Sequence, residues 1–184
     1  INSGSDAGSA INVIMYVTMS TTGNALDFGD LSTARSYARA VASQTRGVSI
    51  GGYGPTSDVI DFITISTQGN AADFGDISSG SNGGIAAASN AIRGLFAGGS
   101  PTANEVNLIT IATQGDSKEF GDLTRSTADS GAAASPTRYT IFGGSGSNVI
   151  EYKEFASSGD TIDFGNLTQS ISETAGCSNG HGGL

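Results

Sequence analysis

The sequence predicts an all-β fold built from four repeats. A phrase of the type Asp-Phe-Gly-Asp occurs four times, and its phenylalanines, Phe28, Phe74, Phe120 and Phe164, are 46, 46 and 44 residues apart. Twenty-eight glycines in 184 residues indicate many turns and closely approaching strands. A period of this length, made of short strand-like runs, is typical of stacked or radial repeat architectures. We therefore predict a single domain over residues 1–184.

Each repeat starts with two β-rich runs. The first is a short apolar stretch that ends in a glycine doublet, as in Val48–Gly52, Leu95–Gly99 and Thr140–Gly144. The second is the longest run of the repeat, and it comprises residues 14–20, 60–66, 106–112 and 150–156. It is rich in β-branched and aromatic residues and is followed by turn residues, which is typical of a strand.

The alternation of apolar residues in the long run shifts by one position partway along it. Ile60 and Phe62 alternate, and then Ile63 and Ile65 alternate with the parity shifted by one. A strand buried on one face cannot shift parity without a β-bulge or burial on both faces. We therefore expect this strand to be packed between neighbouring sheets.

Two further elements complete the repeat. The Asp-Phe-Gly-Asp phrase predicts a short strand ending in a turn, with its phenylalanine wedged against the next repeat and its acidic residues holding the turn. A stretch of small residues follows, at 36–43, 83–89, 128–135 and 173–178. Small side chains at one position of every repeat predict close packing there.

The glycine doublets and the aromatic spacing resemble a kelch-type β-propeller blade. The matching residues are the doublets at 51–52, 98–99 and 143–144, then Phe62, Leu108 and Tyr152 in the following strand, with Phe74, Phe120 and Phe164 where kelch repeats usually have tryptophan. The chain contains no tryptophan, and its first doublet is the degenerate Ser3-Gly4. The resemblance implies four four-stranded blades of about 46 residues each.

The wording of the repeat is also similar to repeats in tail-fibre and structural proteins of marine and cyanobacterial phages. The matching segments are residues 67–77 and the ending Cys177–Leu184. This second resemblance implies a virion or extracellular location and a structural or adhesive role. The partners it implies are other copies of the chain, virion proteins, or a cell-surface glycan or receptor.

The two ends of the chain fall within one repeat unit. The series at 46–52 has a split counterpart, His181–Leu184 at one end and Ile1–Gly4 at the other. We predict that the first and last strands complete one blade and close a ring of four, which removes exposed strand edges. Two alternatives remain: the chain is a segment of a longer repeat protein, or molecules complement one another's strands and form a filament.

Composition excludes several function classes. The net charge of −9 argues against partners that need a basic surface, such as nucleic acid or anionic lipid. The sequence contains no run of 18 apolar residues of the kind that predicts membrane insertion. Its single cysteine, Cys177, allows neither an intrachain disulfide nor a thiolate cluster. We expect no cofactor and no enzyme activity, because no motif brings a catalytic set together.

Two sets of side chains are candidate sites. Calcium would suit the repeated acidic residues Asp27, Asp30, Asp73 and Asp76, although capping of turns is the favoured role. A ring formed by Arg46, Arg93, Arg138 and His181 would suit an anion or a glycan, although packing between blades and pairing with carboxylates is favoured.

Two function classes follow from these predictions. The first is a non-enzymatic structural or adhesive β-propeller that binds a host surface or glycan through loops. The loops that differ most between repeats are 52–58, 99–104 and 144–148. The second class is a self-assembling filament or scaffold subunit.

Overall fold

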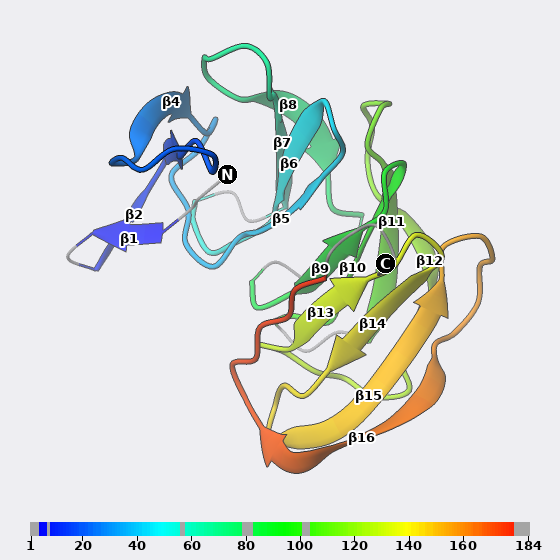
Figure 1. Ribbon diagram of the computed structural model, residues 1–184. Coiled ribbons are helices and arrows are strands. Elements are labelled where there is room, and N and C mark those ends of the chain that lie inside the picture. The colour runs from blue at the N-terminus through cyan, green and yellow to red at the C-terminus, as the bar shows by residue number, and fades with distance from the viewer. Residues whose placement is uncertain (1–3, 7, 56–57, 79–82, 101–103, 179–184) are drawn as a thin grey trace.

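The computed structural model describes residues 4–6, 8–55, 58–78, 83–100 and 104–178. Within these ranges the fold is all-β, with sixteen strands in five antiparallel sheets and no helix (Figure 1). The prediction of an all-β chain with repeated sheets is therefore confirmed. No sheet closes on itself. The described part of the chain accordingly offers no helix that could span a bilayer.

Three of the sheets have four strands in chain order. The first contains β5 (Arg39–Ala42), β6 (Arg46–Ile50), β7 (Val59–Thr64) and β8 (Ala72–Asp76). The second contains β9 (Ala86–Ser89), β10 (Arg93–Ala97), β11 (Glu105–Thr110) and β12 (Lys118–Asp122). The third contains β13 (Gly131–Ala134), β14 (Arg138–Phe142), β15 (Ser147–Glu154) and β16 (Ile162–Ile171). Each sheet contains one copy of each of the four predicted elements. The small-residue strand is the first strand of its sheet, however, and not the last element of the preceding repeat as predicted.

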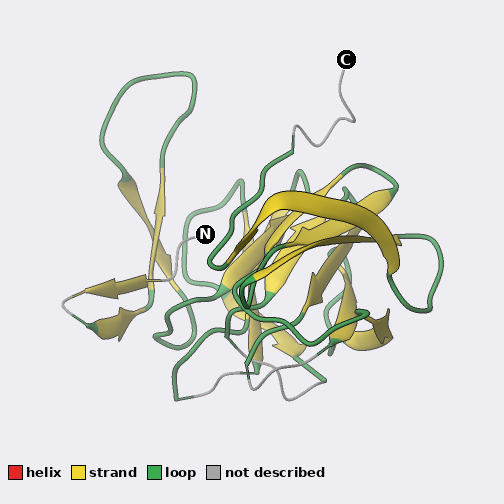
Figure 2. Ribbon diagram, turned by 90° about the horizontal axis from the view of Figure 1, so that it is seen from below, coloured by secondary structure: helices red, strands yellow, loops and turns green. Residues whose placement is uncertain are grey.

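The first repeat is shorter, and it forms two small sheets. In one, β1 (Gly4–Asp6) pairs with β2 (Ser9–Ile11), and in the other β3 (Val13–Tyr16) pairs with β4 (Leu26–Asp30). Figure 2 shows both hairpins at one side of the three larger sheets. The predicted completion of one blade by both termini depends on residues 1–3 and 179–184, which lie outside the described residues. The part of this region that is described, β1, pairs with its neighbour β2.

The predicted parity shift corresponds to a β-bulge. The pairing of β7 with β8 changes register between Ile60 and Asp61, and the equivalent pairings shift at the same place in the other three repeats. Both Ile60 and Ile63 are buried, although they lie on opposite sides of the regular alternation. The expectation of a bulged strand packed on both faces is confirmed.

The hydrophobic core lies between neighbouring sheets, and the repeated phenylalanine belongs to it. Phe28 of β4 packs in one cluster with Ile63 of β7, and Phe74 of β8 packs in another with Ile109 of β11. The predicted wedge is confirmed at these two positions. Burial of a phenylalanine of this kind contributes about 1.5–3 kcal/mol to stability.

Backbone hydrogen bonds also join each sheet to the next. Gly69 N donates to Phe28 O over 2.8 Å, and Ala71 N donates to Asp30 O over 2.8 Å. Asn70 Oδ1, between these donors, accepts a bond of 3.1 Å from Asp30 N. We call this set the inter-sheet junction. It recurs between β8 and residues 115–117 and between β12 and residues 159–161.

The small-residue stretches form the strands β5, β9 and β13, which lie side by side. β9 contacts both β5 and β13, and Ser89 Oγ on β9 donates to the carbonyl of Ala42 on β5 over 3.0 Å. The predicted close packing of these stretches is confirmed. Together with residues 176–178 they line a cavity of about 360 Å³.

Candidate functional site

The first acidic residue of the repeated phrase, where it is an aspartate, bonds to the backbone within the outer strand, which is the strand that carries the phrase (β4, β8, β12 or β16). Asp27 Oδ1 accepts a 3.0 Å hydrogen bond from Gly29 N, and Asp73 Oδ1 accepts an equivalent 3.0 Å bond from Gly75 N. They are side-chain bonds to backbone N–H groups, as the favoured role requires, but they lie within β4 and β8 and not in a turn that follows these strands. Within the described ranges, no group of three or more acidic, histidine or cysteine side chains is placed to hold a metal ion. Calcium at Asp27, Asp30, Asp73 or Asp76 remains a prediction.

Asp76 differs from the other acidic residues in its electrostatic surroundings. Partial desolvation raises the pKa of its carboxyl group, and the nearby carboxylates of Asp58, Asp116 and Asp73 raise this pKa further. A raised pKa means that the folded protein binds this proton more tightly than the unfolded chain does. Repulsion at Asp76 is therefore relieved in acid and is present in full at neutral pH.

We expect the Asp76→Asn variant to melt at a higher temperature than the wild type at neutral pH. The difference should shrink as the pH falls below the raised pKa, because Asp76 is then protonated in the wild type as well. Thermal unfolding of both proteins, followed by circular dichroism at neutral pH and at a pH below the raised pKa, measures the difference in melting temperature. In about 1 M NaCl, where the Debye length is about 3 Å, the neutral-pH difference should also shrink. A stabilisation independent of both pH and salt would contradict the electrostatic cause.

The predicted arginine ring is occupied by contacts within the protein. The Arg46 guanidinium donates to Ile111 O over 3.1 Å and lies over the Phe62 ring. Arg93 donates to Phe155 O in the next sheet. Arg138 forms an ion pair with Glu154 at 2.6 Å and lies over Tyr152. These contacts agree with the favoured packing role, and a ligand ring remains a prediction.

The fourth member of that ring, His181, lies outside the described residues. Only the three arginines can therefore be placed, and each belongs to the second strand of a four-stranded sheet.

A buried polar position on the third strand of each large sheet was missed by the sequence reasoning. Asp61, Asn107 and Glu151 occupy equivalent places on β7, β11 and β15, and all three are buried. Each accepts hydrogen bonds from a hydroxyl that follows the preceding outer strand: Ser32 to Asp61 (2.9 Å), Ser78 to Asn107 (3.1 Å) and Thr124 to Glu151 (2.7 Å). A second polar link thus joins each sheet to the next.

The first of these polar positions also carries a buried ion pair. Arg35 Nη2 lies 2.9 Å from Asp61 Oδ2, and both side chains are fully buried. Burial lowers the pKa of the Arg35 guanidinium, and Asp61 opposes that change. The alternation of the surrounding apolar residues could not reveal this pair, because the bulge brings Asp61 into the core.

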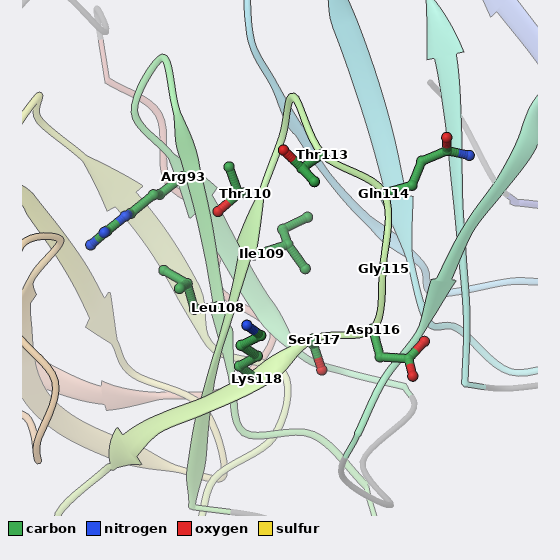
Figure 3. A pocket seen from close by; sticks show the side chains of 10 residues that line it. All are labelled: Arg93, Leu108, Ile109, Thr110, Thr113, Gln114, Gly115, Asp116, Ser117 and Lys118. Atoms are coloured by element: carbon green, nitrogen blue, oxygen red, sulfur yellow. The ribbon is translucent and has the colours of Figure 1, made fainter.

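The groove drawn in Figure 3 is lined by residues of β10 and β11 and by the segment 113–118, and its volume is about 700 Å³. Arg93 points to one side of it, while Gln114 and Asp116 lie on the other. Gln114 Nε2 donates to Asp73 O, and Asp116 Oδ1 accepts from Asp76 N. Asp116 belongs to an inter-sheet junction, and Gln114 makes a further bond across the same two sheets. This groove is therefore a consequence of sheet packing rather than a ready binding site.

Two exposed tyrosines lie next to each other where the segments around Ser36 and Tyr53 are paired. Tyr37 and Tyr53 are edge to face, with ring centroids 5.7 Å apart and an interplanar angle of 69°. Two backbone hydrogen bonds between Ser36 and Tyr53, of 2.9 and 2.7 Å, hold the two segments together. The Tyr53 ring covers Gly83 of the next repeat, where a Cβ would lie within 2.6 Å of the ring. We call Tyr37 and Tyr53 the tyrosine pair.

The positive φ of Tyr37 is a property of this position in every repeat and does not depend on the aromatic side chain. Tyr37 has φ of 58°, and the equivalent residues Gly84, Asp129 and Glu173 have φ of 70°, 56° and 55°. The fold therefore requires a left-handed residue at this position in each repeat. Glycine satisfies this conformation without strain, so a tyrosine here is not explained by backbone geometry.

No family model matches the chain, and no curated protein matches it.

Proposed function

We propose that this chain is a non-enzymatic structural and adhesive module of a virion or extracellular assembly, whose repeats are blades of β-propeller type. Its binding face carries the tyrosine pair and takes a cell-surface glycan. The three four-stranded sheets in chain order and their repeated junctions support the propeller interpretation. Closure of a four-blade ring remains a prediction.

The observation that carries the adhesive role is the exposed tyrosine pair. Tyr53 lies in the loop 52–58, one of those predicted to determine specificity, and its backbone is fixed by two hydrogen bonds. Tyrosine offers a large, rigid contact area with a polar tip at low entropic cost, and serine, glycine and asparagine supply adaptable hydrogen bonds around it. Ser36 and Gly54 adjoin the two tyrosines along the chain, and Ser100 pairs with Gly83, which lies against the Tyr53 ring.

We expect the wild-type chain to bind a subset of oligosaccharides on a glycan array. Tyr53→Ala should weaken this binding by more than about tenfold, because truncation of a central tyrosine removes a large part of the contact energy at a binding site. Tyr37→Gly should weaken it similarly without unfolding the protein, since Gly84 already occupies the same position with φ of 70°.

Asp129→Gly is the matched control for Tyr37→Gly. It makes the same exchange at the equivalent position of the third repeat, where φ is 56°, and it should leave glycan binding unchanged. The glycan proposal is overturned if the wild type binds no glycan, or if both glycine variants lose binding to the same extent.

A further inference from the structure

The inter-sheet junction occurs three times within the chain, and one unused half of it is present at each end. The donor half is the residue triplet that precedes an outer strand, represented by residues 69–71, 115–117 and 159–161. The acceptor half is the outer strand of the preceding sheet. In the first repeat the equivalent donor triplet is Gly23-Asn24-Ala25, and in the last sheet the equivalent acceptor is the segment 164–166 of β16.

Neither terminal half is engaged within the described residues. Apart from the pairing of β16 with β15, the described residues form no backbone hydrogen bond donated by Gly23, Asn24 or Ala25, and none accepted by Phe164 or Asn166. Gly165 also keeps the junction conformation, with φ of 138° against 147°, 144° and 139° at Gly29, Gly75 and Gly121. The acceptor edge is thus shaped for a triplet that is not seated on it.

Apolar side chains on both halves are more exposed than their counterparts in the internal junctions, which are buried or, at Phe120, partly buried. Phe164 is 58% exposed, whereas its counterparts Phe28 and Phe74 are 9% and 3% exposed. Val17 is also 58% exposed, whereas the equivalent Ile63 is 8% exposed because it packs in one cluster with Phe28. The packing of Phe28 against Ile63 at the internal junction shows what would cover these two side chains. Phe164 of one molecule would pack against Val17 of another.

We propose that a second copy of this chain docks head to tail, with its triplet 23–25 and Val17 seated on the β16 edge of the first copy. Gly23 N would donate to Phe164 O, Ala25 N to Asn166 O, and Asn24 Oδ1 would accept from Asn166 N. Such a contact joins two different surfaces and leaves one of each free, so it extends beyond a dimer.

One feature of the internal junctions is not repeated at this interface. Met15 occupies the place of the buried polar residues Asp61, Asn107 and Glu151, so Thr168 of the neighbouring copy finds no carboxylate or amide there. Met15 is itself exposed and adds apolar area. Because each chain carries a net charge of −9, repulsion between copies opposes docking, and salt should strengthen the association.

Sedimentation velocity of the full chain over a range of concentrations tests this proposal. We expect the mass to rise with concentration, and to rise further in high salt. Asn24→Ala should weaken association about fivefold through the loss of one hydrogen bond. Phe164→Lys should weaken association by more than about tenfold, because it replaces the central apolar contact with a charge.

Asn70→Ala is the matched control, because Asn70 occupies the place of Asn24 in an internal junction. Asn70→Ala should lower the melting temperature and leave association unchanged. Asn24→Ala should weaken association and leave the melting temperature of the monomer unchanged. A chain that stays monomeric at every concentration overturns the proposal. So does a monomer whose melting temperature falls with Asn24→Ala, because that result indicates closure within one chain. Glycan binding is measured separately and does not depend on either outcome.

Discussion

Gly75→Ala is expected to destabilise the protein by roughly 3–5 kcal/mol, the combined effect of backbone strain and a broken junction. A Cβ at Gly75 would lie 2.6 Å from the carbonyl oxygen of Gly115, so the loop 115–117 must move away. The hydrogen bonds from Gly115 N to Phe74 O (2.7 Å) and from Ser117 N to Asp76 O (2.9 Å) would then be lost. Urea unfolding with linear extrapolation measures the change.

Gly165→Ala is the control that separates strain from contact. Gly165 has a similar φ of 138°, but a Cβ there would meet nothing within 4 Å. We expect it to cost only the strain, about 1–3 kcal/mol, at a concentration low enough to keep the chain monomeric. Equal losses for the two variants would contradict the role of the junction in holding neighbouring sheets together.

The regular parts of this fold could be predicted because they repeat. Four copies of one phrase located the outer strands, and the shifted parity around Ile60 and Ile63 indicated a bulge or burial on both faces. The Gly-Gly doublets and the small-residue stretches marked the other strands in the same way. Averaging over copies suppresses the noise that makes a single strand of four or five residues hard to recognise.

The polar interior was not predictable by the same reasoning, because it depends on which sheet each residue faces. The pattern of apolar residues led to no prediction for Asp61, which follows Ile60 at the bulge and is buried against Arg35 of a preceding loop. The tyrosine pair was missed for a related reason. Tyr37 and Tyr53 meet only when the segments 36–37 and 53–54 are joined by backbone bonds, and neither residue is repeated along the chain.

The closed ring of four blades was inferred from the matching ends of the sequence. Aligning the four repeats with one another assigns each residue an equivalent position in the other repeats. It does not determine whether the last sheet contacts the first one. Backbone bonds join the described sheets in chain order, and among the described residues Phe164 and Val17 at the two terminal edges are exposed. The same repetition that predicted the blade is therefore compatible with both a closed ring and a growing chain of molecules.

Asp61→Ala is expected to destabilise the protein by about 3–5 kcal/mol, because removing one partner leaves a buried charge without compensation. Arg35 is fully buried, and its guanidinium has no hydrogen-bond partner in the described part of the chain other than its ion-pair contact with Asp61. Ser32 would lose its acceptor as well. The free energy of unfolding from urea titration measures the loss.

The double variant Arg35→Met with Asp61→Ala determines whether the loss comes from the unpaired arginine. Replacing both members of a buried ion pair with apolar groups is often close to neutral, so the double variant should recover most of the stability lost in Asp61→Ala. Asn107→Ala, at the equivalent place on β11, should cost only about 1–3 kcal/mol, because it removes a neutral hydrogen-bond acceptor. If the double variant is as unstable as Asp61→Ala, the energetic role of this position lies in the hydrogen bond to Ser32 and not in the charge of Arg35.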